Sequence, residues 1–166
     1  MDRRRREWLD RYGLTCMRLH GSLDRICIFD DFARQLGLSE PAVSGAEYYI
    51  KRFDIVPCTV AALAQRVKAA VGMEHLRVSA PKGLDQRVWR VGLPWGGLGL
   101  FVNVATQAKL LEIGCNVFIA GKTDDYGFRF ARDQGVALIE TSHKISENAG
   151  LSHFTHYGPR LPQLPP

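Results

Sequence analysis

Residues 117–147 read VFIAGKTDDYGFRFARDQGVALIETSHKISE, and this stretch decides the fold class. The apolar runs at 117–120 and 136–139 are short and continuous, as in strands buried on both faces, and the second strand is predicted to cover 136–140. The segment 123–134 between them predicts a helix, with Asp124 and Asp125 as capping residues at its N-terminus. A strand, a helix and a second strand in this order are typical of an α/β sheet covered by helices.

The rest of the chain extends this alternation. Further helices are predicted at 2–12, 24–36, 59–71, 101–112 and after His143, and further strands at 14–19, 48–56, 76–78 and 88–91. The strands at 76–78 and 88–91 are joined by a turn at 81–83, and Pro57 is expected to end the strand at 48–56. We therefore predict one α/β domain over residues 1–158, with a mixed sheet flanked by helices, and a Pro-rich tail over 159–166.

Two local patterns refine the helices. The helix at 59–71 has Thr59 as its N-cap and stops at Gly72. The helix at 24–36 is expected to bury the face that carries Ile26, Phe29, Ala33 and Leu36.

The composition is that of a soluble globular protein, with 46% hydrophobic and 23% charged residues among 166. Four arginines at 3–6 carry much of the net charge of +5. A basic run can bind nucleic acid or anionic lipid, or form the solvated face of a helix. No basic stripe with interleaved aromatic residues is found elsewhere, so nucleic acid is not expected as a partner.

Cysteine usage and hydropathy indicate a cytoplasmic protein. The cysteines at 16, 27, 58 and 115 form no C-x-x-C pair, and Cys16 and Cys115 are predicted to be buried thiols. No apolar stretch is long enough to span a membrane, and no signal peptide is expected.

The main candidate site is the pair His143 and Glu147. Residues four apart share one face of a helix, and this helix follows a buried strand. An imidazole and a carboxylate held together are a half-site for a divalent metal ion. The alternative is an exposed histidine at a helix start, with a glutamate that favours the helix dipole.

Three other patterns have both a functional and a structural interpretation. His20 and Asp24 follow the strand at 14–19 and form a second candidate half-site, although Asp24 could simply cap the helix at 24–36. The glycine-rich turn at 95–99 can hold an anion at a helix start or be only a tight turn. His153 and His156 are interpreted as a surface pair.

Several of these segments, in this order, resemble the Nif-three-like dinuclear metal-centre family, also called GTP cyclohydrolase I type 2 homologues. The strand at 115–121, the helix end at 131–135 and the motif Ser142-His143-x3-Glu147 are similar to that family's C-terminal part. The segments that resemble its earlier part are 14–24, which ends in His20-x3-Asp24, the helix and Leu-Gly-Leu at 29–38, and the glycine-rich turn at 96–99.

The resemblance implies an α/β fold and a toroidal homo-hexamer with two divalent metal ions per subunit. Residue by residue, it implies Asp24 and His143 as metal ligands, Glu147 as a ligand that can bridge two ions, and His20 as a neighbouring histidine. Zinc, iron and manganese all suit such a ligand set.

The chain departs from the family in one respect. The family also supplies an adjacent His-His pair upstream of the strand at 14–19, whereas residues 1–13 contain no histidine. This implies a truncated or a degenerate member, with one weak metal site or none. Two functions stay open: a divalent-metal-binding protein that acts as a metal-dependent hydrolase on a nucleotide or another small phosphate-bearing ligand, and a non-catalytic oligomeric scaffold with a degenerate site.

Overall fold

The computed structural model describes residues 2–16, 21–94 and 100–157. The helices are α1 (Arg3–Arg11), α2 (Gly21–Leu23), the π-helix η1 (Asp24–Ile28), α3 (Phe29–Gln35), α4 (Val60–Val71), α5 (Leu100–Glu112), α6 (Asp125–Asp133) and α7 (His143–Tyr157). The strands are β1 (Val43–Ser44), β2 (Lys51–Thr59), β3 (Arg77–Ser79), β4 (Arg87–Gly92), β5 (Val117–Ala120) and β6 (Ala137–Glu140).

The described strands form one mixed sheet in the order β1-β2-β4-β5-β6-β3. The central strands β4, β5 and β6 are parallel, and Phe118 of β5 lies opposite both Gly92 and Leu138. The remaining neighbours, β1–β2, β2–β4 and β3–β6, pair antiparallel. The predicted mixed α/β sheet is therefore confirmed.

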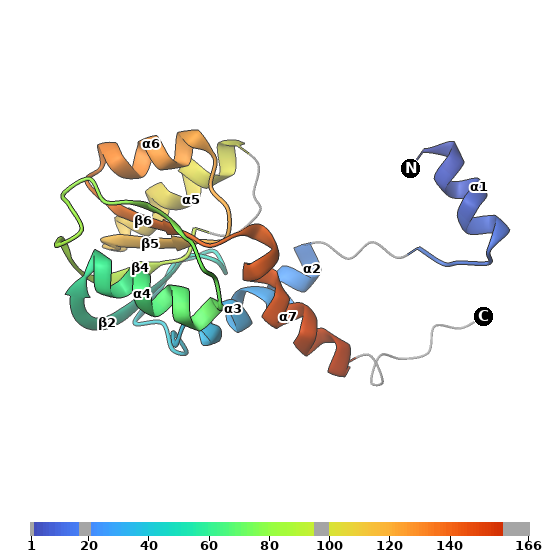
Figure 1. The fold of residues 1–166 in the computed structure, drawn as a ribbon, viewed down its shortest axis with the longest axis horizontal. Helices are drawn as coiled ribbons and strands as arrows, with labels where there is room; N and C mark the ends of the chain where they lie inside the picture. The colour runs from blue at the N-terminus through green and yellow to red at the C-terminus, as the bar shows by residue number, and fades with distance from the viewer. Residues whose placement is uncertain (1, 17–20, 95–99, 158–166) are drawn as a thin grey trace.

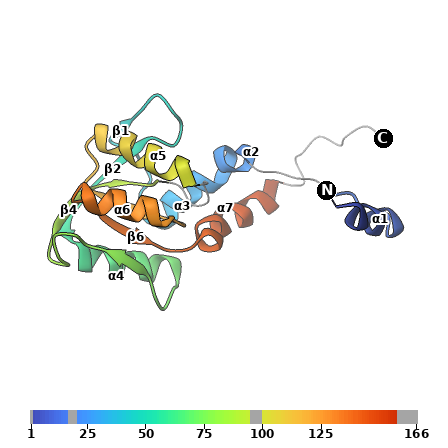
Figure 2. The ribbon, with the colours of Figure 1, turned by 90° about the horizontal axis from the view of Figure 1, so that it is seen from above.

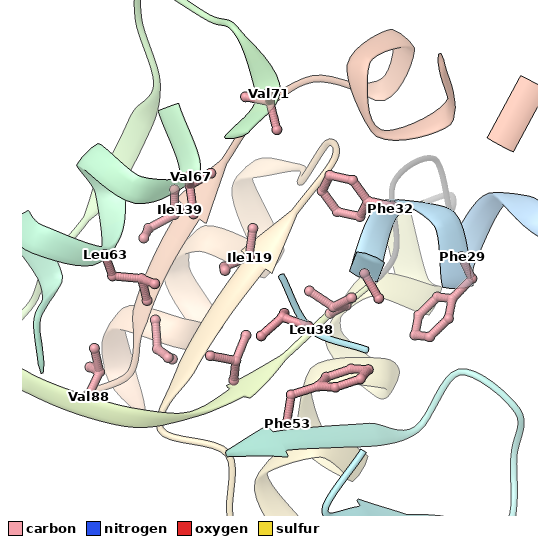
Figure 3. Close-up of a cluster of buried hydrophobic side chains, with 14 of the residues drawn as sticks. Phe29, Phe32, Leu38, Phe53, Leu63, Val67, Val71, Val88, Ile119 and Ile139 are labelled. Carbon is pink, nitrogen blue, oxygen red and sulfur yellow. The ribbon is translucent and has the colours of Figure 1, made fainter. Parts of the chain in front are cut away.

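Helices cover both faces of this sheet (Figure 1). On β5, Val117 and Ile119 join the core beneath α4 and α3, whereas Phe118 and Ala120 join the core beneath α5 and α6. Successive side chains of a strand point to opposite faces, so a strand buried on both sides reads as an unbroken apolar run. Figure 3 shows the first of these cores, where Phe32, Leu63 and Val67 converge on Ile119 and Ile139.

The predicted capping residues mark the ends of helices in the structure. Thr59 accepts a hydrogen bond from the backbone N–H of Ala62 at 3.1 Å and caps α4, and Gly72 ends it with a φ of 65°. Asp124 caps α6 in the same way through the N–H of Gly127 at 2.7 Å. Short polar caps satisfy backbone groups that the first turn of a helix leaves unpaired.

Pro57 does not end a strand. It lies within β2, at a register shift between Asp54 and Cys58 in the pairing with β4. A proline is tolerated in a strand where a bulge leaves its missing N–H without a partner to donate to.

The strands on either side of the turn at 81–83 do not pair with each other. β3 lies at one edge of the sheet against β6, with Val78 opposite Ile139, whereas β4 lies next to β2 and β5. The turn itself forms, with the Gly83 N–H bonded to the Ala80 carbonyl. The chain therefore crosses the sheet instead of making a hairpin.

Two further predictions near the N-terminus need correction. Residues 14–16 form no strand, and residues 17–20 of the predicted strand lie outside the described residues. Ile26 is 60% exposed because η1 is a π-helix, which takes one residue more per turn than the predicted α-helix. The buried residues there are Cys27, Ile28 and Phe29.

Helix α1 contains no buried residue. Figures 1 and 2 both draw it apart from the sheet, and Trp8 and Tyr12 are exposed. Along the described residues, no helix is both long enough and apolar enough to cross a bilayer.

The thiols differ strongly in exposure, and Cys16 is exposed rather than buried as predicted. Burial raises the pKa of the Cys115 thiol to about 12. Since only the thiolate reacts and Cys115 is buried, we expect iodoacetamide at pH 8 to label Cys115 far more slowly than the exposed Cys16. Peptide mapping of a labelling time course measures the two rates. Cys16→Ser serves as the control, and rapid labelling of Cys115 in the folded protein would contradict the prediction.

Candidate metal centre

The carboxyl ends of the three parallel strands meet at one edge of the sheet, where α/β proteins commonly bind ligands. Helix α7 begins at this edge, three residues after the end of β6. Ser142 fixes the start of the helix, because its hydroxyl accepts a hydrogen bond from the Ile145 N–H at 3.1 Å. The first turn of α7 therefore presents His143 beside the end of β6.

His143 and Glu147 are in direct contact, as their spacing predicted. Nε2 of His143 lies 2.7 Å from Oε1 of Glu147, one turn further along α7. The two side chains are 48% and 26% exposed, so an ion in solution can reach both. This contact orients the imidazole and leaves Nδ1 of His143 and Oε2 of Glu147 as the atoms that it does not use.

Asp24 lies on η1, one of the elements that pack against α7. It does not cap a helix start, because helical structure already begins at Gly21. Burial raises the pKa of the Tyr49 hydroxyl, and the negative charge of Asp24 adds to this shift.

The other predicted ligand, His20, lies outside the described residues. Within the described ranges, no three His, Cys, Asp or Glu side chains come together as a metal-binding group. The structure thus brings together His143 and Glu147 of the four predicted ligands.

The same edge carries polar residues that the sequence did not point to. Glu140, the last residue of β6, accepts a hydrogen bond from the Thr123 N–H and so ties the loop after β5 to β6. Gln107 of α5 is fully buried, and neither atom of its amide has a hydrogen-bond partner in the described part of the chain. The sequence could have indicated Glu140 as a site residue, because it is a polar residue at the carboxyl end of a buried strand. No pattern in the sequence around Gln107 indicates that its side chain is buried at this edge.

His153 is not one of a surface pair. Its Nδ1 lies 2.8 Å from Oδ2 of Asp31, a carboxylate on α3 that is only 6% exposed. The other carboxylate oxygen of Asp31 lies 2.6 Å from Nη2 of Arg34. This cluster joins α7 to α3 and contributes to holding the helix that carries His143 and Glu147.

Comparison with known proteins supports the resemblance inferred from sequence. The family model described as Duf34/NIF3 (NGG1p interacting factor 3) matches residues 4–158. A curated relative, the Protein NIF3 homolog of Schizosaccharomyces pombe, is 29% identical over 96 residues, which cover 58% of this chain and 32% of the relative.

Solved structures share the fold at low sequence identity. A hypothetical protein from Staphylococcus aureus superposes with a TM-score of 0.71 at 16% identity, covering 90% of this chain and 63% of that one. A protein from Thermus thermophilus gives a TM-score of 0.68 at 24% identity, covering 95% and 62%. The chain thus spans about a third of the curated relative's length and under two thirds of each of these structures.

Proposed function

The chain belongs to the Duf34/NIF3 family, and from that premise we propose that it binds a divalent metal ion through His143 and Glu147. The contact of 2.7 Å between these side chains at the carboxyl edge of the sheet is the observation that supports this most strongly. The donor set fits, because an imidazole nitrogen and carboxylate oxygens are ligands for zinc, iron and manganese.

Two side chains rarely retain an ion alone, since protein sites usually supply three or more ligands. We propose Asp24 as a third ligand, because η1 packs against α7 and carries its carboxylate. His20, just before α2, is the proposed fourth.

The proposed activity is metal-dependent hydrolysis of a phosphate-bearing substrate. A bound divalent ion would supply Lewis acidity toward a phosphoryl oxygen and lower the pKa of a water molecule. Glu147 would orient His143, and the α7 start would fix both at the sheet edge. Because protons compete with metal ions for the imidazole, binding should weaken as pH falls.

The test is metal content per chain by plasma mass spectrometry after saturation with zinc or manganese and gel filtration. We expect His143→Ala and Glu147→Ala to lose most of the metal, because a ligand truncation typically weakens such a site by far more than the 10–100-fold seen for supporting residues. His156→Ala is the matched control, since this exposed histidine lies on the same helix. Equal metal content in all four proteins would refute the site, and unchanged content in Asp24→Ala would remove Asp24 from it.

A second candidate function is a non-catalytic homo-oligomeric scaffold, a hexamer if it follows the resemblance. The exposed apolar side chains of Trp8, Tyr12 and Leu14 favour it, because an uncovered apolar surface often marks a contact with another protein. Light scattering on the same samples distinguishes the two functions. An oligomer that persists in chelator, with no metal in the untreated protein, would support the scaffold and refute the metal site.

A further inference from the structure

A hollow in the protein surface lies at the opposite edge of the sheet from His143 and Glu147. It has a volume of about 470 Å³, within the usual range for small-molecule sites. Its walls come from the amino end of β4, the loops that lead into β5 and β6, and the turn between β3 and β4. The residues that matter for its chemistry are Lys82, Gln86, Arg87, Trp89 and Arg90.

The charge of this hollow is entirely positive. Lys82, Arg87 and Arg90 line it, and its lining contains no aspartate or glutamate. Within the described ranges, none of these three cations forms an ion pair, whereas Arg52 on the neighbouring strand β2 does. Asp54 lies opposite Arg90 across the β2–β4 pairing, but its carboxylate is bound by Arg52 at 2.9 Å.

The backbone positions one of these cations and lies close to a second. Nη2 of Arg87 donates to the Pro57 carbonyl at 3.0 Å, which fixes the guanidinium at the rim. Gly135 has a φ of 69°, and a Cβ there would lie 2.9 Å from Cε of Lys82 and 3.1 Å from its Nζ. The end of the Lys82 side chain therefore lies directly beside Gly135 at the hollow, although the structure gives its ammonium no hydrogen-bond partner within the described residues.

Unused hydrogen-bonding groups lie beside the same hollow. Nε of Arg90 and Oε1 of Gln86 are buried and have no hydrogen-bond partner in the described part of the chain. A buried polar group without a partner is costly unless something else satisfies it. Both atoms lie just beneath the lining of the hollow, so a ligand would satisfy them only if these two side chains turn toward it.

An aromatic surface completes the site. Trp89 lies on β4 between Val88 and Arg90, and its side chain is 39% exposed while it lines the hollow. An exposed indole beside arginines offers a stacking surface for a flat base. Guanidinium groups bind phosphate oxygens in a matching planar geometry.

We propose that this hollow binds a nucleoside phosphate, with the phosphates against Lys82, Arg87 and Arg90 and the base against Trp89. The site is separate from His143 and Glu147, which lie past the carboxyl end of β6, whereas the residues of the hollow lie on or before β4 and just before β5 and β6. It therefore requires no metal ion and does not depend on the function proposed above.

Calorimetric titration with ATP in EDTA tests the proposal directly, because chelation removes any contribution from metal-bridged phosphate. We expect Lys82→Glu to weaken ATP binding at least about tenfold, the size of effect given by losing a charge-assisted hydrogen bond. Arg66→Glu is the matched control, since this exposed arginine lies on α4, across the sheet, and should leave the affinity within twofold. Circular dichroism verifies that both variants are folded.

Two further titrations separate the parts of the ligand. Trp89→Ala should weaken ATP binding but leave inorganic triphosphate binding unchanged, because only the base meets the indole. His143→Ala should bind ATP like the unmodified chain. The proposal fails if ATP does not bind at millimolar concentration, if His143→Ala abolishes binding, or if Lys82→Glu and Arg66→Glu weaken it equally. It also fails if a single-stranded oligonucleotide binds at this site far more tightly than ATP, since the ligand would then be a nucleic acid.

Discussion

Replacing Gly150 with alanine is expected to destabilise the fold by roughly 2–3 kcal/mol, although the same change usually stabilises a helix. A Cβ at Gly150 would lie 2.4 Å from Cα of Ile28 and 2.8 Å from its backbone nitrogen. Both are backbone atoms of η1, and Ile28 is itself only 3% exposed, so neither neighbour can move aside cheaply. The substitution must therefore push α7 away from η1.

The close contact and helix propensity predict opposite changes in unfolding free energy for Gly150→Ala, so the direction of the change distinguishes them. Without the close contact, alanine in the middle of α7 would gain about 0.5–1 kcal/mol over glycine. Urea unfolding compared with Ser152→Ala, an exposed position on the same helix, separates the contact from helix propensity. A Gly150→Ala protein that is more stable than the unmodified chain would show that α7 and η1 are not in contact.

The same substitution also bears on the proposed metal site. Gly150 lies one turn beyond Glu147, and Ile28 lies one turn beyond Asp24. If these side chains act on one ion, a displaced α7 should lower metal content even at temperatures where the protein remains folded. A lower metal content in Gly150→Ala would therefore show that the packing of α7 against η1 positions ligands from both helices around one ion.

The sequence predicted best those features that depend on neighbours along the chain. The bounds of α4 follow from Thr59 and Gly72, and β5 follows from an unbroken apolar run of four residues. The contact of His143 with Glu147 was predicted for the same reason, because helix geometry alone brings residues four apart together.

Features that depend on distant partners were missed. The turn at 81–83 resembles a hairpin turn, but β3 finds its partner in β6, some sixty residues away by chain. The extra residue per turn in η1 rotates the buried face and leaves Ile26 exposed, a shift that helix periodicity does not reveal. Gln107 and the hollow around Trp89 are likewise made by several elements at once, so no single motif marks them.

The salt-bridge cluster of Asp31 is the clearest feature of this kind, and its loss is expected to be costly. Asp31 is 6% exposed, and its two oxygens contact His153 of α7 and Arg34 of its own helix. A carboxylate that is buried this far is tolerated only while its partners remain. Asp31→Ala should lose about 3 kcal/mol of unfolding free energy, because it removes two charge-assisted contacts of about 1.5–3 kcal/mol each, reduced here because both partners are partly exposed.

A double-mutant cycle isolates the contact between the two helices. Asp31→Ala, His153→Ala and the double variant should give a coupling energy of about 1.5–3 kcal/mol, as expected for a hydrogen bond to a charged group. Asp133→Ala is the control, because Asp133 also pairs with an arginine but on an exposed part of α6, where ion pairs contribute little. A coupling below about 0.5 kcal/mol would mean that α7 is held by its apolar contacts and by the close approach at Gly150 alone. The cluster would then orient the end of α7 without stabilising it, and the placement of His143 and Glu147 would rest on the apolar contacts of α7 and on the contact between Gly150 and Ile28.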